Sequence, residues 1–320
     1  MSVQDKPVVL FGGGGFLGRQ VAQELLSRGF RIRIAQRDIR ATQAIRSLGN
    51  MGQTQFLSID ITRPDQVAAA LAGAGAAVNL VGLLRGDMQA IHVTGAETIA
   101  RAASAAGLEA LVHVSAIGAD PDSNSAYGRT KGEGEIAVRA AFPRATILRP
   151  SILFGNDDGF TNRFAQLIVV GSAVPLLRAV PLIRGETRFQ PIDAGDVARV
   201  VATAVGDHDR FGGETYELGG PDVLTLAQIN AWIAEHTGRK VNFLPIPDGI
   251  ASAMATLTGW APCAPITRDQ FRMLLKDNVV APDAKGIAPF GITPTPMAAR
   301  APAWLSQYRK LGRFGRPAAS

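Results

Sequence analysis

A glycine-rich turn near the start of the chain constrains its fold more than any other feature. The run FGGGGFLGR at residues 11–19 contains three regularly spaced glycines, Gly12, Gly15 and Gly18. An apolar strand at 8–12 leads into the turn, and Phe16 and Leu17 begin the buried face of the helix that follows. Glycines let a backbone approach a phosphate closely, and a helix N-terminus supplies amide donors and the positive end of a dipole. The turn therefore predicts a dinucleotide site, the alternative being a tight packing turn without a ligand.

The rhythm of apolar runs in the first half of the chain predicts an α/β fold. Short Val- and Ile-rich stretches alternate with helical stretches, and they lie at 8–12, 32–35, 55–60, 76–82, 110–116 and 145–150. Continuous apolar strands separated by helices are typical of a parallel sheet that is covered on both faces. We therefore expect a doubly wound parallel sheet, that is, a Rossmann fold, with a smaller C-terminal lobe.

The rhythm changes after residue 150, which suggests where the domains divide. We expect an NAD(P)-binding Rossmann domain at 1–150, to which a strand and helix at 187–220 return. The segments 151–186 and 221–320 then form the C-terminal lobe. Within that lobe, Thr225 is the expected N-cap of a helix that ends at Gly238.

The end of the second strand predicts which dinucleotide is bound. An NAD site usually has a carboxylate there to accept hydrogen bonds from the ribose. In this chain the position is Gln36, followed by Arg37, and Arg19 comes directly after the last glycine. Two guanidiniums suit a 2′-phosphate, so we expect NADP(H) rather than NAD(H). In the alternative, both arginines are solvated and Asp38 binds the ribose.

Other candidate cofactor contacts follow the remaining strands. An open parallel sheet binds its ligands at the carboxyl ends of its strands. The residues at these ends are Asp60, Ile61, Val81, Gly82, Pro150 and Ser151. Asp60 can reach an adenine from there, or it can cap the helix that begins at Pro64.

A catalytic set is suggested by residues after the fifth strand. Ser115 ends that strand, and YGRTK places Tyr127 and Lys131 at positions i and i+4 of one helix. A nearby ammonium favours the phenolate of a tyrosine, which would let Tyr127 pass a proton while a hydride moves to or from a nicotinamide. Ser115 would hold the oxygen of the substrate.

Composition and charge exclude several classes of function. The net charge is +6, but the basic residues are scattered and only 3 Tyr and 3 Trp are present, so we expect no nucleic-acid binding. Cys263 is the single cysteine and the 4 histidines are dispersed, so we expect no disulfide, no metal site and a reducing compartment. A strand begins within roughly seven residues of the N-terminus, which predicts no signal or transit peptide and a cytoplasmic protein.

One stretch of the C-terminal lobe is a candidate contact surface. The segment PDGIASAMATLTGWAPCAPI at 247–266 carries almost no charge. Its helix could lie on a partner or a membrane surface, or it could be an ordinary core helix of the lobe.

Over residues 7–240 the chain resembles the short-chain dehydrogenase/reductase superfamily, in its extended or atypical branch. The carrying residues are Gly12, Gly15, Gly18, Asp60, Ser115, Tyr127, Lys131 and the segment RPSILFG at 149–155. The resemblance implies that 149–155 lies beside the nicotinamide and that Lys131 also contacts its ribose.

A narrower resemblance spans nearly the whole chain. The segments GGGGFLGR, AFPRATILRPSILFG, RFQPIDAGDVA, PITRDQFRMLLKDNVV and GITPTPM are similar to the nucleotide-binding accessory subunits of respiratory complex I. This resemblance implies complex I subunits as partners, a peripheral location on the inner face of the respiratory membrane, and a tightly held NADPH with a structural role.

One departure from the enzyme pattern bears on catalysis. Many extended enzymes carry Asn where this chain has His92, at the position that orients a water for the lysine. An imidazole could relay a proton there, or His92 could be a helix-surface residue in a site without catalytic demand. We expect an NADP(H)-binding subunit that helps assemble or stabilise a respiratory complex. The alternatives are an NADPH-dependent reductase, dehydrogenase or epimerase acting on an apolar, quinone-like or sterol-like substrate, and a redox sensor.

Overall fold

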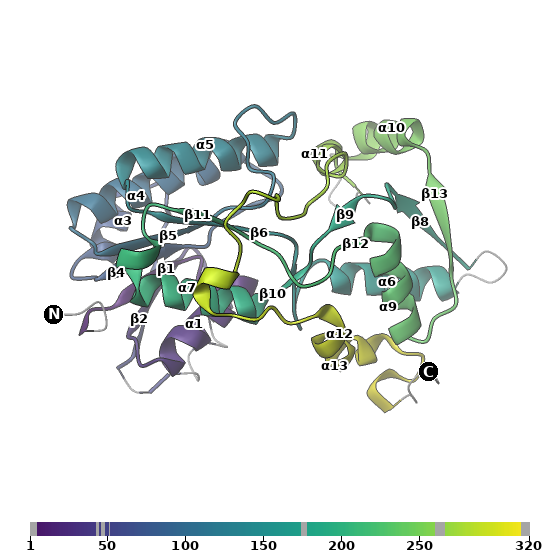
Figure 1. Cartoon of the computed structure of the whole chain (residues 1–320), viewed down its shortest axis with the longest axis horizontal. Coiled ribbons are helices and arrows are strands. Elements are labelled where there is room, and N and C mark those ends of the chain that lie inside the picture. The colour runs from purple at the N-terminus through teal and green to yellow at the C-terminus, as the bar shows by residue number, and fades with distance from the viewer. Residues whose placement is uncertain are drawn as a thin grey trace. The chain divides into compact units, whose positions relative to one another are not determined.

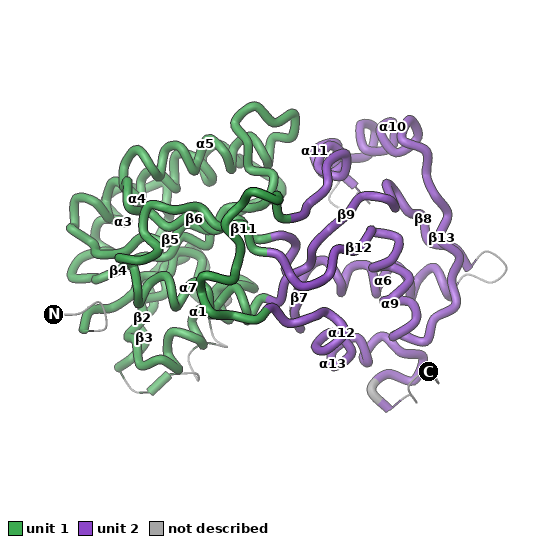
Figure 2. The backbone as a smooth tube through the Cα atoms, viewed as in Figure 1, with its two compact units in different colours: residues 1–150, 194–218, 280–293 green, residues 151–193, 219–279, 294–320 purple. Residues whose placement is uncertain are grey.

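The computed structural model describes residues 5–42, 45, 49–50, 52–173, 178–259 and 266–314. The chain divides into two compact units, which Figure 2 shows in different colours. Unit 1 comprises Met1–Pro150, Ala194–Leu218 and Val280–Thr293, and unit 2 comprises Ser151–Asp193, Gly219–Val279 and Pro294–Ser320. Cys263 lies outside the described residues.

A seven-stranded sheet forms the centre of unit 1 (Figure 1), and all its strand pairs are parallel. Its strands are β1 (Val8–Phe11), β2 (Ile32–Gln36), β3 (Thr54–Ser58), β4 (Ala76–Asn79), β5 (Ala110–Val114), β6 (Thr146–Pro150) and β11 (Thr215–Leu218). The order across the sheet is β11-β6-β5-β4-β1-β2-β3. This order confirms the expected doubly wound Rossmann fold.

Helices cover both faces of this sheet. The described helical segments of unit 1 are α1 (Phe16–Ser27), η2 (Ile39–Thr42), α3 (Pro64–Leu71), η3 (Gln89–Gly95), α4 (Ala96–Ala105), α5 (Ala126–Ala141), α7 (Ala194–Gly206), α8 (His208–Phe211) and η4 (Ala288–Phe290). On one face α1 packs beside α7, and on the other α3, α4 and α5 lie side by side (Figure 1). Four of the five residues of β5 and all of β1 are apolar and buried, which is why these strands carry no polar alternation.

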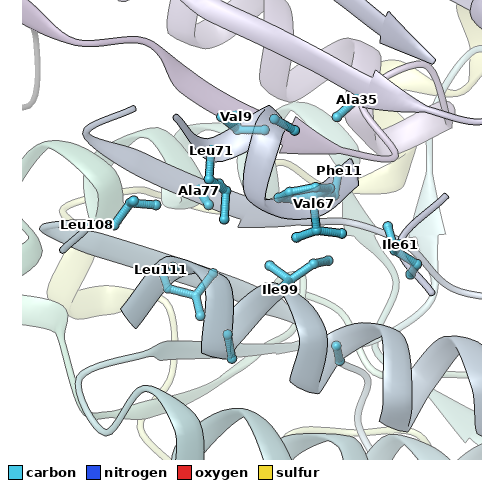
Figure 3. Packing of buried hydrophobic residues seen from close by; sticks show 14 of the residues in the cluster. Val9, Phe11, Ala35, Ile61, Val67, Leu71, Ala77, Ile99, Leu108 and Leu111 are labelled. Atoms are coloured by element: carbon cyan, nitrogen blue, oxygen red, sulfur yellow. The ribbon is translucent and has the colours of Figure 1, made fainter. Parts of the chain in front are cut away.

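The core beneath α3 and α4 fixes the strands that carry the glycine turn. Val9 and Phe11 of β1 pack there with Val67 of α3 and Ile99 of α4, and all four side chains are fully buried (Figure 3). The sheet order reverses at β1, which lies between β2 and β4. The turns after β1 and β4 therefore meet at the switch point where such sheets bind ligands.

The segment 280–293 belongs to unit 1, although the sequence placed it in the C-terminal lobe. Phe290 stacks on Phe211 with ring centroids 4.2 Å apart, and the N–H of Glu217 donates to the carbonyl of Lys285 at 2.9 Å. The expected returning segment 187–220 contributes only 194–218 to this unit. These contacts join residues far apart in the chain, so local periodicity gives no signal for them.

Unit 2 is built from short strands and helices. They are β7 (Leu153–Phe154), α6 (Thr161–Ala173), β8 (Ala179–Ile183), β9 (Arg188–Phe189), β10 (Ile192–Asp193), β12 (Leu224–Thr225), α9 (Leu226–His236), β13 (Asn242–Ile246), α10 (Asp248–Thr258), α11 (Arg268–Met273), α12 (Met297–Arg300), α13 (Pro302–Leu305), η5 (Ser306–Tyr308) and η6 (Gly312–Phe314). Its main core gathers residues of α6, α9 and α13, including Ile168, Ile229 and Leu305. The sequence predicted Thr225 as the N-cap of α9, and the structure confirms it and adds a capping box between Thr225 and Gln228.

Helix α10 has one buried side and one exposed apolar side. Ala251 and Ala255 pack with Ile266 and Phe271 in a small separate core, whereas Leu257 is 73% exposed. In the described part of 247–266, one side of the helix therefore packs in a core, and the other side is exposed to solvent. No helix in the described ranges is long and apolar enough to cross a membrane.

Candidate nucleotide site

The glycine turn between β1 and α1 has the geometry that its sequence requires. Gly12 has φ +79°, in the left-handed region that favours glycine. A Cβ on Gly18 would lie 2.5 Å from the carbonyl oxygen of Gly12, so only glycine lets α1 pack this closely on the turn. Gly15 is the N-cap of α1 and no side chain caps the helix. The first amides of α1, at Phe16, Leu17 and Gly18, are thus available to an anion.

The peptide of Gly14 is held from both sides by residues near the expected ribose site. Its N–H donates to Oε1 of Gln36 at 2.7 Å, and its carbonyl accepts a hydrogen bond from Nη1 of Arg19 at 3.3 Å. The structure therefore brings Arg19 and the end of β2 together at the glycine turn. Sequence reasoning noted at Gln36 only the missing carboxylate and did not predict its contact with Gly14.

Arg37 is exposed and lies near Asp60, whose pKa it helps to lower. The main cause of the lowered pKa of Asp60 is the N–H of Thr62, which donates to Oδ1 at 2.9 Å. Asp60 therefore closes a local turn and does not cap α3, whose N-cap is Arg63. The side chain of Asp38 is engaged similarly, because its Oδ1 accepts from the N–H of Arg40 at 2.9 Å.

Two further candidates, Ile61 and Val81, have mainly packing contacts. Ile61 is buried in the core beneath α3 and α4, and Val81 packs against the same core. A Cβ added to Gly12 would lie 3.2 Å from Cγ2 of Val81, so Val81 borders the glycine turn.

Lys131 and Gly82 lie together next to the turn after β4. A Cβ on Gly82 would be 3.4 Å from Nζ of Lys131, so glycine leaves the ammonium room. Nζ donates to the carbonyl of Val114 at 3.1 Å, and the side chain is buried. Burial lowers the pKa of Lys131 to about 8, while the charge of Glu135 acts in the opposite direction.

The hydroxyl of Ser115 is a buried polar group that could bind a ligand. Its side chain is buried, and Oγ has no hydrogen-bond partner among the described residues. A buried hydroxyl without a partner is costly, and a ligand oxygen would satisfy it. The residue therefore fits the expectation that it holds a substrate or cofactor oxygen.

Tyr127 does not have the expected activated phenol. The side chain is half-buried, and burial raises its pKa to about 12. The sequence predicted the opposite direction, because it placed an ammonium beside the phenol. Loss of solvation is the cause of the raised pKa, and the Lys131 ammonium is directed to the carbonyl of Val114.

His92 is buried and its ring connects Leu83 to Thr130 by hydrogen bonds, which corrects the expectation of a helix-surface histidine. It lies in the π-helix η3, where its Nε2 accepts from the N–H of Leu83 at 2.9 Å. The proton is therefore on Nδ1, which lies 2.8 Å from Oγ1 of Thr130. The ring also meets that of Tyr127 edge-on, with centroids 5.5 Å apart. Both ring nitrogens are engaged, which leaves neither free to relay a proton.

A second buried histidine lies beneath this site and was missed by sequence reasoning. Nδ1 of His113 on β5 is 3.2 Å from Nδ2 of Asn79, its partner on β4. Nε2 is buried without a partner among the described residues. The only available signal was one polar residue in each of the apolar strands AAVN and ALVHV.

These two histidines predict that the protein loses stability in mild acid. Burial, with the charge of Lys131 as the second cause, lowers the pKa of both His92 and His113 from 6.5 to about 3. The unfolded chain takes up these protons near pH 6.5, so stability falls as the pH drops from about 6.5 towards 3. We expect each histidine to remove up to about 2 kcal/mol between pH 6.5 and pH 5. Urea unfolding of His92→Asn should show about half the wild-type loss of stability between pH 6.5 and pH 5. An equal loss in the wild type and in His92→Asn would contradict the assignment of this pH dependence to His92.

The last two candidates follow β6. The carbonyl of Pro150 accepts from the N–H of Ile117 at 3.1 Å within unit 1. Ser151 belongs to unit 2, where its hydroxyl lies 2.7 Å from Oδ1 of Asn278 and is buried. Its hydroxyl therefore has a structural partner in its own unit. The described residues contain no group of three or more His, Cys, Asp and Glu suited to a metal ion.

The fold and this site define a Rossmann-fold protein with a glycine turn of the dinucleotide-binding type. The sequence pattern of the NmrA-like family matches residues 4–258, and the chain belongs to this family. It is 32% identical over 316 residues to mitochondrial NADH dehydrogenase (ubiquinone) 1 alpha subcomplex subunit 9 of Rattus norvegicus, covering 96% of this chain and 82% of the relative. It is 28% identical to the ceramide reductase of Caulobacter vibrioides, covering 79% and 78%.

A solved structure supports the same fold. The NADPH-dependent quinone oxidoreductase QOR2 of Escherichia coli, complexed with NADPH, superposes with a TM-score of 0.74 at 18% identity. The match covers 93% of this chain and 99% of the enzyme. The resemblances expected from the sequence, to extended short-chain dehydrogenases and to complex I accessory subunits, are thus confirmed.

Proposed function

We propose that the chain binds NADP(H) at the glycine turn of unit 1. The observation that carries this proposal is the uncapped N-terminus of α1, approached closely by a turn whose Gly12 and Gly18 admit no side chain. The amides of Phe16 and Leu17 would hold the pyrophosphate. Lys131 and Ser115 would face the nicotinamide end, which suits the buried ammonium and the unpartnered hydroxyl.

The charges around the expected ribose site support NADP(H) over NAD(H). No carboxylate ends β2, and Gln36 is occupied by the N–H of Gly14. Asp38, the alternative ribose ligand, has one oxygen engaged with the backbone of its own turn. Arg37 is exposed, and Arg19 lies at the same turn with its Nη1 donating to the carbonyl of Gly14, so these two residues would bind a 2′-phosphate.

We further propose that the nucleotide has a structural role. The bound nicotinamide would supply hydride chemistry, but the residues around it are poorly arranged for proton transfer. The Tyr127 phenol has its pKa raised to about 12, and both nitrogens of His92 are engaged. A phenol whose pKa is raised is a weak general base at neutral pH, and His92 is not free to accept its proton.

The partner is inferred from the relatives. The rat protein is a subunit of NADH dehydrogenase (ubiquinone), and the similarity extends over 96% of this chain. We infer that this chain associates peripherally with a respiratory complex I and helps to assemble or stabilise it, with NADP(H) keeping unit 1 folded.

The alternative function is an NADPH-dependent reductase or dehydrogenase of an apolar substrate. Retention of Ser115 with Tyr127 and Lys131 favours it, as does the similarity to a ceramide reductase. The reductase or dehydrogenase would need the phenol of Tyr127 for turnover, whereas a structural nucleotide would not.

Native purification tests the proposal. The chain should be recovered from membranes together with complex I subunits, and acid extraction should release NADP(H) rather than NAD(H). Arg37→Asp should lower NADP(H) occupancy about tenfold or more through loss of a charge-assisted contact. Arg101→Asp, which changes an exposed arginine on α4, is the control and should retain the nucleotide.

Two outcomes would overturn the proposal. Recovery only as a soluble protein that oxidises NADPH, with turnover abolished in Tyr127→Phe, would establish the alternative function. Recovery with complex I but with NAD(H) bound, in both the wild type and Arg37→Asp, would defeat the 2′-phosphate assignment.

A further inference from the structure

The net positive charge of the chain arises in one segment. Residues 284–320 contain six Lys and Arg and no Asp or Glu, so the whole net charge of +6 lies there. Lys285 pairs with Glu214 at 2.7 Å and Arg300 with Asp193 at 3.4 Å. The other four are Arg309, Lys310, Arg313 and Arg316.

Two large apolar side chains lie among these cations and are exposed. Leu311 is 74% exposed, and Phe314 in η6 is 98% exposed. Lys310 is exposed as well, and no carboxylate of the described residues forms an ion pair with it. We call Arg309, Lys310, Leu311 and Phe314 the basic edge.

The chain is firmly attached to unit 2 just before the basic edge. Leu305 is buried in the main core, and the hydroxyl of Tyr308 donates to Oδ1 of Asn162 at 2.8 Å. Two nitrogens of Arg239 donate to the carbonyl of Tyr308, each at 3.1 Å. Nε of Arg309 donates to the carbonyl of His236 at 3.3 Å. These contacts fix where the exposed side chains leave the surface.

The same contacts connect the basic edge to further cations. Arg239 lines a groove of about 570 Å³ together with Arg178 and the exposed Lys240, and Glu235 is the one carboxylate among its lining residues. Cations thus extend from the groove to the basic edge across the end of α9. Such a surface attracts phosphate groups over a wide area rather than at one point.

We propose that the basic edge is an interfacial anchor for an anionic lipid bilayer. Leu311 and Phe314 enter the boundary between headgroups and acyl chains, while Arg309, Lys310 and Lys240 contact lipid phosphates. Insertion of apolar side chains and attraction of cations to phosphates are each weak alone, but together they bind a membrane stably. A protein partner would need a larger contiguous apolar centre than two isolated side chains.

Vesicle binding of the full chain tests this proposal. Vesicles of phosphatidylcholine are compared with vesicles in which about a third of the lipid is phosphatidylglycerol. We expect binding to the anionic vesicles only, and loss of most of it when salt rises from about 0.1 M to about 1 M. Lys310→Gln should weaken binding about fivefold. The pair Leu311→Ser and Phe314→Ser should weaken it about tenfold or more.

Leu257→Ser on α10 provides a matched control, because Leu257 is 73% exposed and Leu311 is 74% exposed. It should bind as the wild type does. Absence of binding to anionic vesicles would overturn the proposal, as would equal binding to both kinds of vesicle. Loss of binding in Leu257→Ser with retention in the Leu311→Ser, Phe314→Ser pair would overturn it in favour of α10. The assay uses the isolated chain and does not depend on the nucleotide or on complex I.

Discussion

Replacing Arg149 with methionine is expected to lower the free energy of unfolding by about 3 kcal/mol. Arg149 of β6 binds both oxygens of Glu135 on α5, at 2.9 and 2.6 Å, and lies 3.5 Å from Glu217 of β11. The Glu135 side chain is only 7% exposed. Methionine would fill the space but leave two poorly solvated carboxylates without their cation.

Urea unfolding at neutral pH measures this loss. Arg101→Met is the control. The ion pair of Arg101 with Glu97 lies on the surface of α4 and should contribute less than about 0.5 kcal/mol to the free energy of unfolding. The double variant Arg149→Met with Glu135→Gln should recover part of the loss, since one buried charge is then removed. A single-variant loss no larger than that of Arg101→Met would show that water solvates the network.

Gly18→Ala is expected to weaken NADP(H) binding by at least about a hundredfold, or roughly 2.7 kcal/mol. A Cβ there would lie 2.5 Å from the oxygen of Gly12 and 2.6 Å from the carbonyl carbon of Gly13. Both are backbone atoms in a turn, so they cannot rotate away as a side chain could. Helix α1 must shift away from the turn, and the amides at its N-terminus lose their common direction.

Gly15→Ala in the same turn is the comparison for folding only, because Gly15 is itself one of the glycines proposed to approach the phosphate and cannot serve as a control for binding. Its nearest neighbour would be the Gly12 oxygen at 3.3 Å, and its φ of −69° suits alanine. Titration of NADPH fluorescence measures affinity, and urea unfolding of the nucleotide-free variants separates weak binding from loss of folding. Affinity within about fivefold of wild type in a folded Gly18→Ala protein would exclude the glycine turn as the nucleotide site.

Local patterns were sufficient to predict the first six strands of unit 1 and the kind of sheet that they form. A buried strand such as β1 and an amphipathic helix such as α1 are each specified within about a dozen residues. Glycine spacing specifies the turn between them, because close approach depends only on the missing side chains. The strand ends, and with them Ser115 and Lys131, follow from the same local signals.

The chemical state of the site could not be predicted in this way. The sequence placed Lys131 and Tyr127 on one helix, but the pKa of a phenol depends on how much solvent the surrounding fold removes. The contact of Gln36 with Gly14 also required the fold, because it joins residues that only the β1–β2 pairing brings together.

The sequence by itself determined the Rossmann fold, the glycine turn and the edge of the sheet where a nucleotide would bind. Only the tertiary structure decided that His92 is buried and neutral, that 280–293 belongs to unit 1, and that Leu311 and Phe314 are exposed among cations. The physical reason is one of range. Periodicity and turn chemistry act between neighbours in the chain, whereas burial, protonation and exposure are set by residues that become neighbours only on folding.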